Sequence, residues 1–166
     1  MIDSMSPKAM RARCEARLST LDLPDPFSPE AFCRTLSEER HRPIILHPLH
    51  IGGGLYGAWV PTATTDLIFF EQDTSVLHQQ HICLHELSHL ICGHESEAAA
   101  DARFASLLFP HLDPDAVRRM LKRAAHSSDQ ELEAETLASL IWRKTHRYTV
   151  STDVAPLVGR LEHTLE

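Results

Sequence analysis

One segment of the chain combines a helical pattern with a concentration of histidines. From Ser75 onward apolar residues recur at helical spacing, and Gly93 follows the last of them, which is typical of a helix that ends at a glycine. The chain has twelve histidines, and five of them fall between residues 78 and 94. The chemistry of the chain is therefore expected on this helix.

His85, Glu86 and His89 form an HExxH motif inside the predicted helix. Helical positions four apart face the same side, so both imidazoles can reach one cation at about 2.1 Å. Glu86 would lie beside the ion and accept a proton from its water, because zinc lowers the pKa of that water to about 7. We predict Zn²⁺ as the cofactor, His85 and His89 as ligands, and Glu86 as the catalytic base of peptide hydrolysis.

A catalytic zinc usually has three protein ligands, so a third donor is needed. A later helical run offers three glutamates, and Glu133 shares a face with Leu137 and Leu140 at spacings of four and seven residues. A carboxylate facing a core is costly unless it meets a cation. We therefore prefer Glu133 to Glu131 and Glu135. Glu135 remains an alternative ligand, an acceptor for a ligand histidine, or a solvated residue.

The remaining pattern predicts an α+β fold. Further helices are expected at 7–20, 28–40, 96–109, from Asp113 onward, and at 131–144. Three extended stretches predict a small, twisted, mainly antiparallel sheet at 43–49, 55–61 and 66–72. The HExxH helix should run beneath this sheet and leave a cleft, where an edge strand can align an extended peptide.

The length fits one domain. Its expected parts are N-terminal helices at 1–40, a catalytic core at 41–144 and a C-terminal extension at 145–166.

The two motifs together resemble the ImmA/IrrE family of metallo-endopeptidases. That family has HExxH on one helix and an E-A-N-x-F-A-like segment on a later one, which here reads EAETLA at residues 133 to 138. Two departures are Glu135 in place of the usual asparagine, and Trp142-Arg143 where many members continue with Leu-Met-Pro. The resemblance covers about residues 40 to 142. It implies a minimal zincin-like domain and a cytoplasmic zinc peptidase, often acting on a helix-turn-helix repressor in a stress response, mobile element or toxin–antitoxin pair.

Composition excludes other classes of protein. The net charge of −7 disfavours nucleic acid as a direct partner, and no run of eighteen apolar residues predicts a membrane span. Four scattered cysteines without a CxxC pair do not form a disulfide framework, which is typical of a reducing cytoplasm. The predicted partner is a protein substrate, and the sequence leaves the oligomeric state open.

Other candidate residues near the motif have simpler interpretations. His81 could donate to the metal, orient a ligand or contact substrate, although packing is the commoner role of such a histidine. Four residues and one group are assigned no chemistry: His78 and His94 at the helix ends, Cys83 and Cys92 in the core, and Arg11, Arg13 and Arg17 as a solvated face. The alternative function is a zinc-containing module or toxin–antitoxin component that acts by sequestration without turnover.

Overall fold

The computed structural model describes residues 5–52, 54–94 and 126–147, which form an α+β arrangement as predicted. The elements in chain order are α1 (Pro7–Ser19), α2 (Pro29–Arg40), β1 (Ile44–Leu49), β2 (Gly57–Pro61), β3 (Asp66–Glu71), α3 (Val76–Cys92) and α6 (Ser128–His146). The helices predicted at 96–109 and from Asp113, and most of the 145–166 extension, lie outside the described residues. No described helix combines the length and apolarity needed to cross a bilayer.

The three strands form a mixed sheet in the order β1-β3-β2. β2 and β3 pair antiparallel across a short turn in which Thr62 N–H donates to the Thr65 carbonyl at 2.8 Å. β1 lies on the other side of β3 and pairs with it in parallel. The prediction of a mainly antiparallel sheet is therefore wrong for one of its two pairings, because β1 does not pair with β2, its neighbour in sequence.

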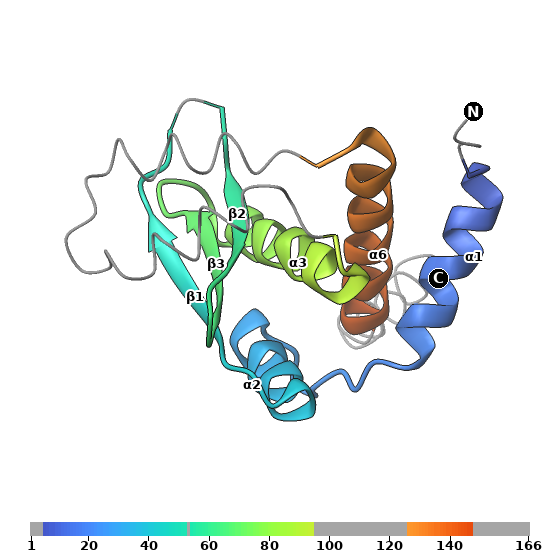
Figure 1. The fold of residues 1–166 in the computed structure, drawn as a ribbon, viewed down its shortest axis with the longest axis horizontal. Helices are drawn as coiled ribbons and strands as arrows, with labels where there is room; N and C mark the ends of the chain where they lie inside the picture. Colours follow the sequence, from blue (N-terminus) through green and yellow to red (C-terminus); the bar gives the residue numbers. More distant parts are fainter. Residues whose placement is uncertain (1–4, 53, 95–125, 148–166) are drawn as a thin grey trace, which may run out of the picture.

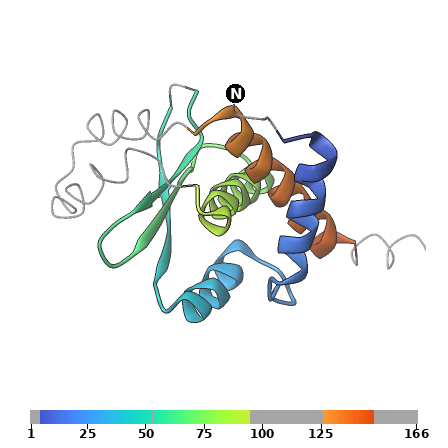
Figure 2. The same ribbon diagram turned by 45° about the vertical axis from the view of Figure 1, so that its right-hand side comes forward.

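The helices stack outward from one side of the sheet. α3 packs against β2 and β3, α6 packs against α3, and α1 packs against α6 (Figure 1). α2 contacts β1 and α3. In the turned view, α3 is seen nearly end-on between the sheet and α6 (Figure 2). The helix with the HExxH motif is thus the central one of the described elements.

The central place of α3 follows from its apolar residues. Leu84, Leu87 and Leu90 are buried in a core that α1, α2 and α6 also line. From α6 come Leu137 and Ile141, which are fully buried. Truncating one such leucine to alanine costs about 2–5 kcal/mol. α3 is therefore held on several sides, and its polar side chains have fixed directions.

The ends of α3 and α6 are capped by their own side chains and turns. Ser75 Oγ accepts a hydrogen bond from His78 N–H, and Gly93 ends α3 with φ 72°. α6 begins with a capping box, in which Ser127 and Gln130 each bond the backbone of the other. Such caps satisfy backbone groups that a helix end leaves free. They fix the first turn of α6, which carries Glu131.

A buried carboxylate at the start of β3 joins the sheet to the chain that leaves α2. Asp66 is 1% exposed, and Arg42 Nε donates to its Oδ2 at 2.9 Å. Arg40 lies 3.3 Å from the same oxygen, and the Trp59 indole N–H donates to Oδ1 at 3.1 Å. Because Trp59 belongs to β2, this group also fixes the strand that faces α3.

Candidate metal centre

Two histidines of the HExxH motif point to the same place from α3. His85 and His89 are four residues apart on one face of the helix, and their Nε2 atoms lie 3.1 Å from each other. His89 is 1% exposed, and the His85 side chain is 21% exposed. His89 is therefore buried, whereas His85 is partly open to solvent.

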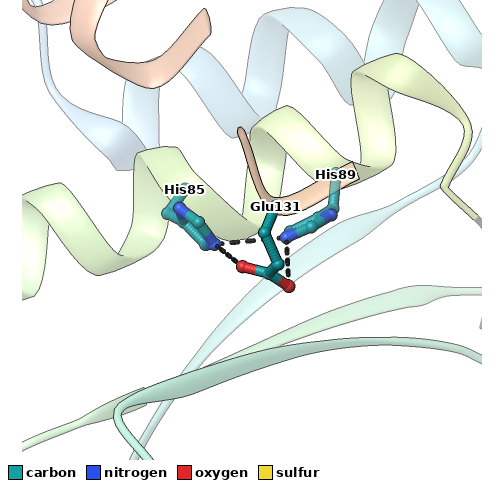
Figure 3. Close-up of side chains that lie close together, drawn as sticks. All are labelled: His85, His89 and Glu131. Atoms are coloured by element: carbon teal, nitrogen blue, oxygen red, sulfur yellow. Dashed lines mark hydrogen bonds and ion pairs between the residues drawn. The ribbon is translucent and has the colours of Figure 1, made fainter. Parts of the chain in front are cut away.

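The carboxylate that meets this pair comes from the first turn of α6. Glu131 Oε2 lies 3.2 Å from His85 Nε2, and Glu131 Oε1 lies 3.4 Å from His89 Nε2 (Figure 3). His85, His89 and Glu131 form a group whose donor atoms all lie within 4.8 Å of one another. Two imidazole nitrogens and a carboxylate thus converge from two helices.

These three residues fit a zinc ion in donor type and in spacing. Imidazole nitrogen and carboxylate oxygen are ordinary zinc ligands, and tetrahedral bonds of about 2.1 Å would separate two nitrogens by roughly 3.4 Å. The observed separation of 3.1 Å is near that value. Burial, followed by charge on His126, His85 and His94, lowers the pKa of His89 to about 2. His89 is therefore neutral, as a metal ligand must be.

The preferred third ligand, Glu133, lies elsewhere. It is buried as predicted, at 5% exposed, but its Oε2 is 2.9 Å from His94 Nε2 and its Oε1 is 3.0 Å from Arg13 Nε. The structure brings Glu131 rather than Glu133 to the histidine pair, because Glu133 meets a different histidine and an arginine. An amphipathic pattern identifies residues that face the core, so it does not indicate Glu131, whose side chain is 46% exposed.

Glu135 lies where one of its predicted roles, an acceptor for a histidine of the pair, would place it. Its Oε2 lies 3.2 Å from His85 Nδ1, the nitrogen that faces away from His89. The same oxygen lies 3.3 Å from His81 Nε2. Glu135 is thus an acceptor for the histidine of the pair that is more exposed, and His81 joins it there without reaching the group of donor atoms.

The glutamate of the motif is buried beside the pair. Glu86 is 8% exposed, and burial raises the pKa of its carboxyl to about 7. Within that net value the charge of Glu131 also raises the pKa, whereas His85 and the backbone N–H of Trp59 lower it. A carboxyl that exchanges its proton near neutral pH suits general acid–base chemistry.

A cavity of about 340 Å³ opens over Glu86 and the histidine pair. Its walls come from α3, β2 with the loop before it, and the start of α6. β2 can approach α3 because residue 57 is glycine, since a Cβ there would lie 2.5 Å from Ile82 Cγ2 and 3.1 Å from Glu86 Oε1. The cavity therefore lies between an edge strand of the sheet and the motif helix.

His126 also lines the cavity, and the sequence analysis did not single it out. Its ring stacks on His89 with centroids 3.9 Å apart and an interplanar angle of 15°. Its Nδ1 is buried without a hydrogen-bond partner among the described residues. The only sequence signal is its position one residue before the Ser127 cap.

Several simpler interpretations have clear outcomes. Cys83 is buried, as expected of a core residue. Arg11 and Arg13 of α1 are exposed, as predicted for a solvated face, but Arg13 also pairs with Glu133, and half-buried Arg17 donates to the Ile91 carbonyl at 2.8 Å. These contacts cross from α1 to α6 and α3, so spacing along α1 could not reveal them.

Comparisons with protein-family models, curated proteins and solved structures found no match. The resemblance to the ImmA/IrrE family therefore stays a prediction from the motif residues. The site stands on its own geometry.

Proposed function

We propose that this chain is a zinc-dependent metallo-endopeptidase in which His85, His89 and Glu131 hold the ion and Glu86 moves the proton. One observation carries the proposal: two Nε2 atoms and two carboxylate oxygens converge within 3.1–3.4 Å beside a buried glutamate in an open cavity. Zinc supplies Lewis acidity, which acidifies a water molecule and polarises a carbonyl group.

The residues of the chain would divide the remaining work. Glu86 accepts a proton from the attacking water and delivers it to the leaving amine, a task that its raised pKa suits. β2 is the edge strand beside the cavity, so an extended peptide can pair with it and present one bond to the site. The substrate is then any accessible extended segment of a protein.

The class of substrate follows only from the resemblance of residues 85–89 and 133–138 to the ImmA/IrrE pattern. On that basis we propose a cytoplasmic regulatory protein, such as a helix-turn-helix repressor, as the target. A zinc module that sequesters a partner without turnover is the competing function. The buried, cavity-facing Glu86 favours the enzyme, because a sequestering module has no use for a costly buried acid.

The decisive experiment compares wild type with Glu86→Gln and Glu131→Gln on a peptide library digested from a bacterial proteome. Wild type should bind one equivalent of zinc and cleave. Glu86→Gln should keep the zinc and lose at least about 100-fold in cleavage rate, because the proton acceptor is gone. Glu131→Gln should weaken zinc binding. Equal cleavage by wild type and Glu86→Gln, or no zinc in wild type, would reject the proposal.

A further inference from the structure

A line of buried polar side chains runs from His89 back to α1. His89 Nδ1 lies 3.0 Å from His94 Nδ1, and His94 Nε2 lies 2.9 Å from Glu133 Oε2. Glu133 Oε1 then lies 3.0 Å from Arg13 Nε, as an ion pair. His89, His94 and Glu133 are 1%, 5% and 5% exposed. Such groups are costly to bury unless they are paired with one another.

The turn after α3 brings His94 into this line. Gly93 has φ 72°, and this left-handed residue sends the chain back so that His94 N–H donates to the His89 carbonyl at 3.0 Å. The His94 ring then lies against the His89 ring, with centroids 5.2 Å apart. Glu133 reaches it from the inward face of α6. His94, which has no obvious role in the sequence, therefore has a specific place.

The order of protons along the line follows from its carboxylate end. A carboxylate only accepts hydrogen bonds, so a neutral His94 must carry its proton on Nε2, toward Glu133. His94 Nδ1 is then an acceptor, and His89 must donate from its own Nδ1. The lone pair of His89 is left on Nε2, the atom that faces His85 and Glu131.

We propose that His94 and Glu133 are positioning residues, which hold His89 in the one tautomer and orientation that can bind the metal. This inference rests on the proposed role of His89 as a ligand. Outer partners of this kind fix the ring of a metal-bound histidine and commonly change metal affinity by 10- to 100-fold. Glu133 thus contributes to the same site without touching the ion.

The same residues could instead form a second metal site, because Cys92, His94 and Glu133 offer donor atoms within 4.8 Å of one another. Positive charge argues against a cation there. The Arg13 guanidinium lies 3.0 Å from Glu133, and that of Arg17 donates to Ile91, next to Cys92. Burial also raises the pKa of the Cys92 thiol to about 12, which keeps it protonated.

The first test uses metal-free wild-type protein labelled with ¹⁵N in histidine. NMR should find the His89 proton on Nδ1 and the His94 proton on Nε2. This measurement needs no variant, so loss of folding in a mutant cannot obscure it. A His89 proton on Nε2 in the folded protein would overturn the proposal.

The second test measures zinc affinity by competition with a chelator. Glu133→Gln removes the charge that orders the line, and its zinc Kd should rise about 10- to 100-fold, with Glu133→Asp recovering part of the loss. The matched control is Glu15→Gln on the exposed face of α1, which should stay within about twofold. An unchanged Kd in folded Glu133→Gln would contradict the proposal.

The outcomes separate this inference from the proposed function. Zinc binding without cleavage would reject the peptidase and leave the positioning role standing, whereas a wild type that binds no zinc would reject both. Two equivalents of zinc in wild type, falling to one in Cys92→Ser, would overturn the positioning role and assign a metal to Cys92, His94 and Glu133.

Discussion

Two buried carboxylates, Asp66 and Glu86, both contact Trp59, but their charged forms are stabilised to different degrees. Asp66 receives hydrogen bonds from the Trp59 indole and from Arg42, with Arg40 close by. Glu86 has the backbone N–H of Trp59 to favour its charged form, and burial raises its pKa to about 7. Asp66 therefore has two arginines as partners, whereas His85 and one backbone N–H do not offset the burial of Glu86.

The difference separates a carboxylate that joins elements of the fold from one that can exchange a proton near neutral pH. A buried carboxylate with cationic partners holds elements together and resists change. A buried carboxylate without them is poised to exchange a proton, and the fold must stabilise it by other means. Because Trp59 contacts both groups, Asp66 fixes the strand that Glu86 faces.

The largest effect is expected for Asp66→Asn, which leaves two guanidinium groups without their anion. The free energy of unfolding should fall by about 2–3 kcal/mol, somewhat less than for a fully buried pair because both arginines keep contact with water. Urea unfolding measures this. The control Asp73→Asn changes an exposed carboxylate and should cost less than about 0.5 kcal/mol. Equal losses would remove the special status of Asp66.

A next-largest effect is expected for Gly57→Ala, which places a methyl group between β2 and α3. The added Cβ would lie 2.5 Å from Ile82 Cγ2 and 3.0 Å from the Phe69 carbonyl. Overpacking of this kind costs about 1–3 kcal/mol. Combining it with Ile82→Ala should show a favourable coupling of about 1 kcal/mol in a double-mutant cycle. Strict additivity would mean that the strand has moved away instead.

The opposite sign is expected for Glu86→Gln in metal-free protein. An amide avoids the cost of burying a charge, so the free energy of unfolding at neutral pH should rise by about 1–2 kcal/mol. Chemical unfolding of chelator-treated wild type and variant measures the change. A loss comparable with that of Asp66→Asn would show that Glu86 is a structural carboxylate too, and the comparison would fail.

The smallest effect is expected for Glu71, another buried carboxylate. Hydrogen bonds from the backbone N–H groups of Gly52, Asp73 and Ile51 hold its pKa below the usual 4.5. A lowered folded pKa gives stability that is present above the unfolded pKa and lost as pH falls through the folded value. Stability should therefore drop on acidification below about pH 4.5, by about 1 kcal/mol more in wild type than in Glu71→Gln. Parallel pH profiles of the two proteins would contradict this.

Local pattern was enough to predict much of the fold and the placement of His85 and His89 on one face of α3. The helical run from Ser75 to Gly93 matches α3 closely, since its apolar spacing and its glycine end are local properties. The mixed pairing of the sheet was not predictable, because β1 pairs with β3 although β2 lies between them in the sequence. Long-range pairing of this kind leaves no signature in either strand alone.

The choice between Glu131 and Glu133 as the third metal ligand shows the limit of predicting from local pattern. Helical spacing placed Glu133 inward, and it is inward. The residues that Glu133 meets depend on the register with which α6 packs on its neighbours. The observed register places His94 and Arg13 opposite Glu133. The same register puts half-exposed Glu131 opposite the histidine pair. Such register is set by packing between distant segments, so amphipathicity cannot supply it.

The place of Trp59 in the cavity wall has a practical consequence for following the protein in solution. The chain has two tryptophans. Trp142 stacks on His146, with ring centroids 3.5 Å apart, and does not line the cavity over Glu86. Trp59 adjoins Glu86 and lines the space where a peptide would sit. Intrinsic fluorescence should therefore report filling of this space without any attached label, with a Trp142→Phe background isolating the single useful emitter.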